Sequence, residues 1–136
     1  MTADSERQLG GASGFSLDVE PERDAVRIAL RGELDLATVG QLERKLTELV
    51  EVGFAKLVID LRGVDFVDST GLHALLTVNA AALRDGWTLS IIPGPPAVQR
   101  LFEITSTLDR LPFTAPNGGA TASKAEDGSY PPNAVQ

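Results

Sequence analysis

The sequence predicts an α/β fold: a mostly parallel, mixed sheet of four to five strands with an N-terminal β-hairpin and helices packed against it. Three observations predict this fold. Two short segments in which apolar and polar residues alternate come first, at 15–20 and 25–31. Amphipathic segments with helical spacing then alternate with short apolar segments. One of these apolar segments, 56–61, is almost wholly apolar at its centre, which is typical of a strand covered on both faces.

Each further element is expected from its own pattern. The first helix has apolar residues at 3.6-residue spacing, and Gly53 is a suitable stop for it. The second helix is expected to bury one apolar face, made of Leu72, Leu75, Leu76, Ala80 and Leu83. The expected elements after the hairpin are a helix at 37–52, a strand at 56–61, a connector at 62–68, a helix at 69–84, a strand at 87–92, a helix at 97–105 that begins beside Pro95 and Pro96, and a short final strand at 108–113.

The composition places the chain among intracellular proteins of one domain. The folded part is expected at 15–113, because 1–14 and 114–136 are rich in small and polar residues and are expected to be flexible tails. With 19 acidic and 12 basic residues, the net charge of −7 argues against nucleic-acid binding and against adsorption to anionic membranes. The chain has no cysteine, no apolar segment long enough to span a bilayer and no signal-peptide pattern, so we expect a cytoplasmic protein.

Polar side chains follow three of the predicted strands at the point where each strand ends. Glu33 and Asp35 follow the second strand, and 93–96 follows the fourth. The cluster after the third strand consists of Asp65, Asp68, Ser69 and Thr70. Ligands of parallel sheets bind at the loops outside the carboxyl ends of the strands. We therefore expect these loops to gather at one edge of the sheet and to form the working surface of the protein.

Ser69 stands where a helix is expected to begin. The structural interpretation is that Asp68 or Ser69 caps this helix by accepting hydrogen bonds from free backbone N–H groups. Gly71 allows either close packing or the approach of a partner to the backbone and Ser69. A phosphate on Ser69 would meet free N–H groups and the positive end of the helix dipole, and it would add a charge of about −1.5 to −2 beside Asp68. The fold would accommodate the phosphate, but a partner docked on this surface would be repelled by it. This combination is what an on/off switch requires.

Four segments resemble the STAS domain, and within it the bacterial anti-sigma-factor antagonists. They occur in order and at the family's spacing, and the resemblance covers about 15–113. The segments are Gly32 to Asp35, Leu57 to Leu61, Val64 to Leu72, and Pro96 to Phe102. His73 is a departure, because these antagonists often have glycine at this position. A single histidine in a helix is usually packed or solvated.

The resemblance implies a partner-switching protein that is not an enzyme and uses no cofactor or metal. An unphosphorylated antagonist binds an anti-sigma factor, which is a serine kinase, and so releases a sigma factor for transcription. The kinase uses ATP to phosphorylate the antagonist, which ends the binding, and a serine phosphatase resets it. Carried over to this chain, the phosphorylated residue is Ser69, and the partner-binding residues are Asp35, Asp68, Ser69, Thr70, Gly71 and Leu72.

Alternatives stand beside this interpretation. A STAS module of a stress-sensing or ligand-binding assembly, without sigma-factor control, would use the same scaffold. A hard-metal site would draw on Asp60, Asp65 and Asp68, and strong Mg²⁺ binding would favour it. A response-regulator receiver needs a late lysine, and the one late lysine, Lys124, lies in the expected tail. An enzyme lacks support, since the chain has one histidine and no nucleophile elbow, phosphate loop or dinucleotide motif.

Overall fold

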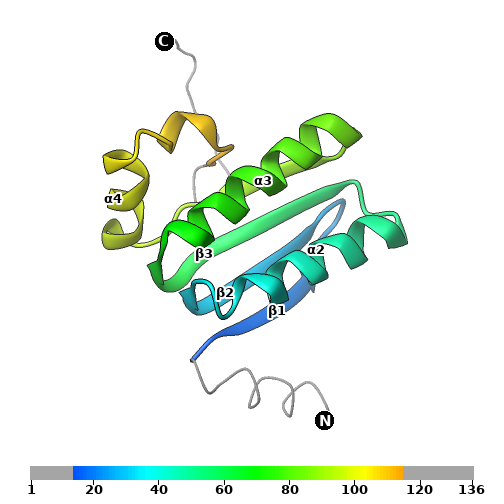
Figure 1. The fold of residues 1–136 in the computed structure, drawn as a ribbon. Coiled ribbons are helices and arrows are strands. Elements are labelled where there is room, and N and C mark those ends of the chain that lie inside the picture. Colours follow the sequence, from blue (N-terminus) through cyan, green and yellow to red (C-terminus); the bar gives the residue numbers. More distant parts are fainter. Residues whose placement is uncertain (1–13, 115–136) are drawn as a thin grey trace.

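The computed structural model describes residues 14–114, which form a four-stranded sheet with three α-helices (Figure 1). The elements in chain order are β1 (Ser16–Pro21), β2 (Val26–Leu34), α2 (Val39–Val52), β3 (Lys56–Val67), α3 (Ser69–Asp85), β4 (Thr88–Ile92), α4 (Pro96–Ile104) and a short 3-10 helix, η2 (Leu108–Arg110). The strands lie in the order β1-β2-β3-β4, with β1 antiparallel to β2 and the other neighbours parallel. The predicted α/β fold, with its hairpin and mostly parallel sheet, is confirmed.

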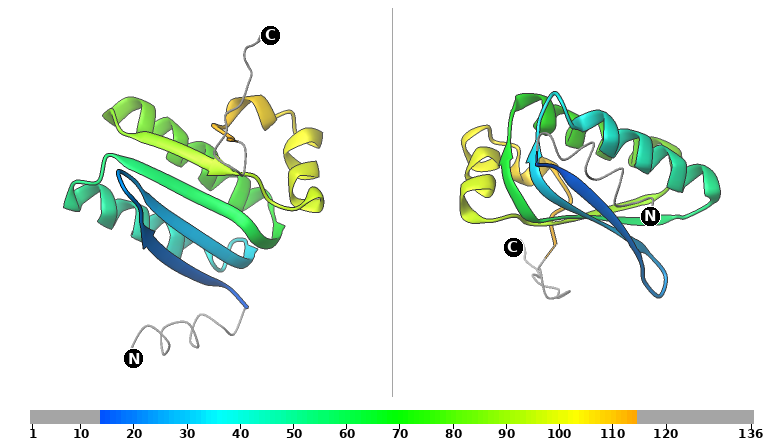
Figure 2. Two further views of the ribbon diagram at one scale, coloured as in Figure 1. Left: turned by 180° about the vertical axis from the view of Figure 1, so that it is seen from behind. Right: turned by 90° about the horizontal axis from the view of Figure 1, so that it is seen from below.

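The helices α2 and α3 cover one face of the sheet (Figures 1 and 2). Leu57, Ile59 and Leu61 of β3 are buried in the core that forms there. Within residues 14–114 no helix covers the opposite face, which Figure 2 shows from behind. The prediction that 56–61 is covered on both faces is therefore wrong. On its second face the segment carries Val58, which is half-buried, and the buried carboxylate of Asp60.

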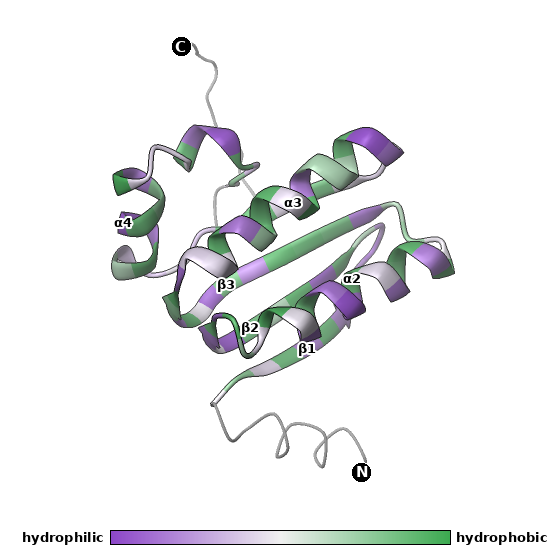
Figure 3. Cartoon of the chain, viewed as in Figure 1, coloured by the Kyte–Doolittle hydropathy of each residue, from purple (hydrophilic) through white to green (hydrophobic). Residues whose placement is uncertain are grey.

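The position of α2 on the sheet follows from its amphipathic pattern. Its buried residues recur at helical spacing, and Figure 3 shows hydrophilic residues on its outward turns. They are Val39, Leu42, Leu46 and Leu49. The helix ends as predicted at Gly53, whose φ of 116° is left-handed and whose N–H bonds to carbonyls of the last turn. It begins two residues later than expected, because 35–38 form a separate turn in which the carbonyl oxygen of Asp35 accepts a hydrogen bond from the N–H of Thr38.

The third strand is longer than the sequence predicts. β3 continues through the expected connector at 62–68 and ends at Val67. The pairing of β3 with β2 shifts register between Ala29 and Arg31 and again between Gly32 and Glu33, so β3 has an extra residue at each place. These bulges change the spacing of the buried residues from two to three, and the buried residues become Leu61, Val64 and Val67. The prediction of a connector at 62–68 was wrong, because a bulged strand loses the alternation of apolar and polar residues by which strands are recognised.

Two further expectations need correction. Ala80 and Leu83, both expected on the inner face of α3, are exposed, Leu83 at 78%. The buried face of α3 instead passes through Val78 and Ala82. The first half of the final strand expected at 108–113 is the helix η2, and only Phe113 forms a bridge, to Ile91 of β4. The first turn of α4 contains proline, as predicted.

The described range contains the whole of the predicted domain, 15–113, and most of both predicted tails lies outside the described residues. Among the helices of residues 14–114, none is long and apolar enough to cross a membrane.

Candidate functional site

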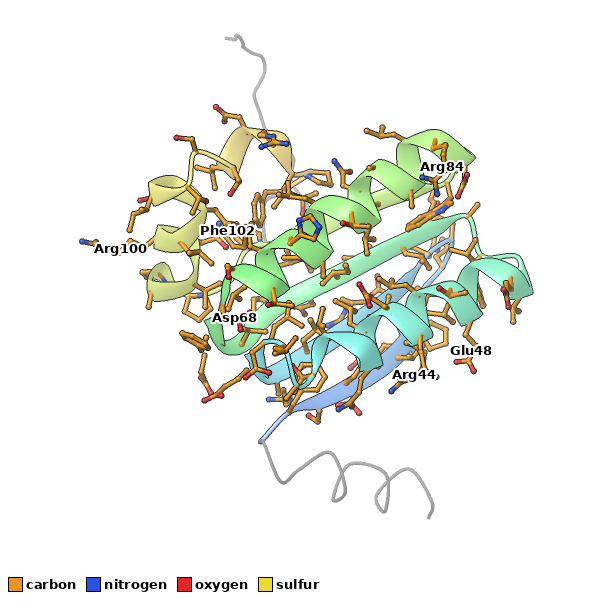
Figure 4. All side chains as sticks on the ribbon, in the orientation of Figure 1. Arg44, Glu48, Asp68, Arg84, Arg100 and Phe102 are labelled. Atoms are coloured by element: carbon orange, nitrogen blue, oxygen red, sulfur yellow. The ribbon has the colours of Figure 1, made fainter. Side chains whose placement is uncertain are left out.

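The carboxyl ends of β2 and β3 lie side by side and bring two of the predicted polar clusters together. Leu34, the last residue of β2, is opposite Val67, the last residue of β3. Asp35 and Asp68 therefore start neighbouring loops, and the N–H of Asp68 bonds to the carbonyl oxygen of Leu34 at 3.2 Å. Figure 4 labels Asp68 at the start of α3, close to the loop between β2 and α2.

Asp68 is the N-cap of α3. Its backbone is extended, and its Oδ1 accepts a hydrogen bond from the N–H of Gly71 at 2.8 Å. Its Oδ2 accepts a second bond, from the N–H of Leu36 at 3.3 Å. The capping interpretation is correct for Asp68 and leaves Ser69 as the first residue of the helix. One carboxylate thus joins the first turn of α3 to the loop after β2.

The loop after β2 is held by a residue that the sequence did not single out. Thr38 is 1% exposed, and its hydroxyl donates to the carbonyl oxygen of Glu33 at 2.7 Å. The hydroxyl oxygen of Thr38 accepts from the N–H of Asp35 at 3.0 Å, while Oδ1 of Asp35 accepts from the N–H of Ala37 at 3.0 Å. The available signal was a threonine directly before a helix, a position that threonine favours.

The six predicted partner-binding residues divide into two groups. Ser69 is exposed, and Asp35, Asp68 and Thr70 are half-buried. The remaining two, Gly71 and Leu72, are buried. A Cβ on Gly71 would come well inside 3.0 Å of the carbonyl oxygen of Leu34. Close packing therefore explains this glycine, and the two buried residues support the surface from beneath.

Apolar side chains stand at the same edge, and the sequence analysis did not single them out. Leu36 is 75% exposed and Phe66 is 49% exposed, although both are large hydrophobic residues. The hydrogen bond from its N–H to Asp68 holds Leu36 at the start of α3, and Phe66 is two residues before Asp68 in the chain. Exposed apolar residues that gather beside polar ones are typical of interaction sites.

The third predicted cluster, 93–96, does not join this surface. β4 ends opposite Asp60, whereas β3 runs on to Val67. Gly94 lies against the carbonyl oxygen of Leu61, which is six residues before the end of β3, or up to about 20 Å along the strand. The strands therefore end at different levels: β2 and β3 end side by side, and β4 ends well before them. Of the three predicted clusters, only those after β2 and β3 lie together.

Asp60 has a structural role on the sheet face that no helix covers. Its Oδ2 bonds to Nη1 of Arg27 at 2.9 Å and to Nη2 of Arg62 at 2.8 Å, and its Oδ1 bonds to Nε of Arg62 at 3.0 Å. Arg27 also pairs with Glu20 and Glu22. Burial alone would raise the pKa of the Asp60 carboxyl, but hydrogen bonds from Arg62 and Arg27 outweigh burial and hold that pKa below its usual value.

Two of the three aspartates that suggested a metal site, Asp60 and Asp68, are engaged in other interactions. The Asp60 carboxylate is paired with two guanidinium groups, and Asp68 accepts backbone N–H bonds. Across residues 14–114, no three His, Cys, Asp or Glu side chains are placed to hold a metal ion together.

Comparison with known proteins agrees with this architecture. Residues 17–112 match the family described as "Mlab, STAS domain". The chain belongs to the STAS domain family. Among curated relatives of this STAS domain is the "Anti-sigma-B factor antagonist" of Bacillus subtilis (strain 168), 30% identical over 105 residues, which cover 77% of this chain and 95% of the relative. A protein of the same name from Staphylococcus aureus (strain NCTC 8325 / PS 47) is 34% identical over 62% of this chain and 78% of its own.

Solved structures include similar folds. An anti-sigma factor antagonist from Mycobacterium paratuberculosis superposes with a TM-score of 0.63 at 26% identity, over 74% of this chain and 86% of that one. The "Bacillus Cell Fate Determinant SpoIIAA in the Phosphorylated Form" has a TM-score of 0.57 at 23% identity, over 79% and 92% of the two chains, which shows a shared fold. The predicted membership of the anti-sigma-factor antagonist group of STAS domains is thereby confirmed.

Gly71 of this STAS domain provides a first test of the geometry. We expect Gly71→Ala to lower the free energy of unfolding by about 1–3 kcal/mol, because the added methyl group must displace either α3 or the backbone of Leu34. Thermal unfolding followed by circular dichroism measures the change. Thr77→Ala, at an exposed position of the same helix, is the control and should melt close to the wild type. Equal melting temperatures for Gly71→Ala and wild type would show that this contact is not required.

Proposed function

We propose that the chain is an anti-sigma-factor antagonist whose binding is switched by phosphorylation of Ser69. Unphosphorylated, it binds an anti-sigma factor that is a serine kinase, and this binding releases a sigma factor. Phosphorylation by the kinase ends the binding, and a serine phosphatase restores it. The chain thus acts in the cytoplasm as a binding protein and not as an enzyme. The names of its curated relatives support the antagonist role.

The observation that carries the proposal is the exposed position of Ser69 at the start of α3. Asp68 takes over the capping of the helix, so the Ser69 hydroxyl is not needed for it. Within residues 14–114 the structure gives the Ser69 hydroxyl no hydrogen bond, and the side chain is open to a kinase. A phosphate there would lie at the positive end of the helix dipole, where the fold favours an anion.

The surroundings of Ser69 suit a docking surface. The charged residues of 33–38 and 64–72 are all acidic, and they are Glu33, Asp35, Asp65 and Asp68. The exposed apolar residues Leu36 and Phe66 stand among them. A surface of this kind fits a partner with an apolar pocket and a basic rim. Phosphorylation would place a dianion at the position where this partner would contact the Ser69 hydroxyl group.

The experiment that tests the proposal is incubation of the protein with its cognate kinase and ATP, followed by intact-mass measurement. We expect one phosphate on wild type and none on Ser69→Ala, and we expect Ser69→Ala to keep its binding to the kinase. Thr70→Ala is the matched control, because it removes the neighbouring hydroxyl and should still gain one phosphate. Phosphate on Thr70, or on a residue outside 14–114 while Ser69 stays unmodified, would disprove the assignment.

A further inference from the structure

The exposed residues of α3 form one stripe along the helix. They include Ser69, His73, Thr77 and Arg84, at helical intervals of four or seven residues. Side chains four residues apart are neighbours on a helix surface, with about 5–6 Å between their Cβ atoms. Ser69 and His73 are therefore adjacent on the same exposed face, one turn apart.

A phosphate on Ser69 would lie beside the carboxylate of Asp68, and His73, one turn along α3, is a basic group that could balance its charge. Other basic side chains of α3 and α4 are remote: Arg84 lies at the opposite end of α3, and Arg100 points outward from α4, away from Asp68 (Figure 4). In the sheet, Arg62 is held by Asp60. Arg31 lies opposite Gly63, four residues or about 13 Å before the end of β3.

We propose that His73 binds the phosphoryl group of phosphorylated Ser69 through a charge-assisted hydrogen bond across the first turn of α3. The bond forms between a ring N–H of His73 and a phosphate oxygen, and the ion pair is strongest when the imidazole is protonated. The proposal rests on the proposed function only for the presence of a phosphate on Ser69. It makes His73 a positioning residue of the phosphorylated state, with no role in the unphosphorylated one.

The elements packed against α3 offer His73 no competing ion pair. α3 contacts α2, β3 and β4, and Asn79 of α3 bonds to η2. β4 contains no charged residue. Among the ion pairs of residues 14–114, none includes His73. The charged groups of the other three elements are Glu43, Arg44, Lys45, Glu48 and Glu51 of α2, Lys56, Asp60, Arg62 and Asp65 of β3, and Asp109 and Arg110 of η2.

The expected consequence is that the phosphorylated state persists longer at lower pH. Between about pH 8 and pH 6 a histidine gains its proton, while a phosphate monoester keeps at least one negative charge. The bond therefore strengthens as the pH falls through this window, and it withholds a phosphate oxygen from a phosphatase. We expect dephosphorylation of the wild type to slow from pH 8 to pH 6 relative to a His73→Gln variant, which cannot ionise.

The direct test places phosphoserine at position 69 during translation, so it requires no kinase. His73 is the one histidine of the chain, so its ring protons give unambiguous signals in a proton NMR titration from pH 5 to pH 9. We expect these ring signals to change over a higher pH range in the protein with phosphoserine 69 than in the unmodified protein, because the phosphate stabilises a protonated ring. The phosphorus signal should titrate at lower pH than in the same phosphoprotein carrying His73→Gln.

A protein with phosphoserine in place of Thr47, an exposed residue of α2, is the matched control. Its His73 signals should titrate as in the unmodified protein. Equal midpoints in all three proteins, or the same rise in both phosphoproteins, would overturn the proposal. Because the phosphate is installed without a kinase, this outcome is separate from a failure of the kinase to modify Ser69.

Discussion

Titration of Ser69→Asp against the kinase is expected to show binding weaker than wild type by a factor of about 10 to 100. In the proposed complex the substitution puts a negative charge where the partner would meet the Ser69 hydroxyl, and unfavourable charge at an interface costs on the order of 1–3 kcal/mol. Aspartate carries one charge, less than the −1.5 to −2 of phosphoserine, so phosphorylation should weaken binding further. Isothermal calorimetry at physiological ionic strength measures the difference.

The control for this prediction is Thr77→Asp. It adds the same charge to the same exposed stripe of α3, two turns away from Ser69. We expect its affinity for the kinase to stay within about twofold of wild type, since exposed charges beyond a Debye length of about 8 Å are largely screened. An equal loss of affinity in both variants would show that the added net charge, and not its position, weakens binding. Unchanged affinity of Ser69→Asp would show that Ser69 is not part of the interface.

Much of the fold could be predicted because its elements have regular periods. The alternating hairpin, the amphipathic α2 with its glycine stop, and the proline in the first turn of α4 all occur close to their expected places. The extension of β3 could not be predicted. Its two bulges put the buried residues at intervals of three, a pattern that fits neither a regular strand nor a helix.

The candidate site was predictable in position and less so in composition. The capping residue Asp68 and the neighbouring loop at Asp35 follow from where parallel strands end. Sequence alone could not show that Thr38 is buried, because a threonine in a polar loop is usually exposed. Nor could it separate exposed Leu36 and Phe66 from core residues, since a large apolar side chain indicates burial in most contexts.

At the start of α3, the fold and the proposed switch use different residues. Asp68 holds the helix end and the β2–α2 loop together, and Gly71 lets them approach. Ser69 lies between them and takes no part in either contact. A change of charge at Ser69 can therefore alter binding while the surrounding backbone stays in place, which is consistent with a switch that acts at the surface.

Asp60→Asn is expected to cause the largest loss of stability among single substitutions on the uncovered sheet face, about 2–3 kcal/mol. The change leaves Arg27 and Arg62 without their shared carboxylate, and removal of one partner of a buried ion pair is costly. The cost falls below the about 3–5 kcal/mol typical of a broken buried pair, because the Arg62 side chain is 52% exposed and water can solvate it. Urea unfolding followed by the fluorescence of Trp87, the one tryptophan, measures it.

The pH dependence of that difference identifies its cause. Because the pKa of Asp60 is lowered in the folded protein, the carboxylate stabilises the fold at pH values above its unfolded pKa of about 4, and this contribution is lost as the pH falls through the folded pKa. The gap between wild type and Asp60→Asn should thus be constant from pH 5 to pH 7 and narrow below pH 4. Asp24→Asn, which removes an exposed pair with Lys56, should show little change at any pH. A gap for Asp60→Asn that persists unchanged to pH 2 would assign the loss to packing and not to the ion pairs of the carboxylate.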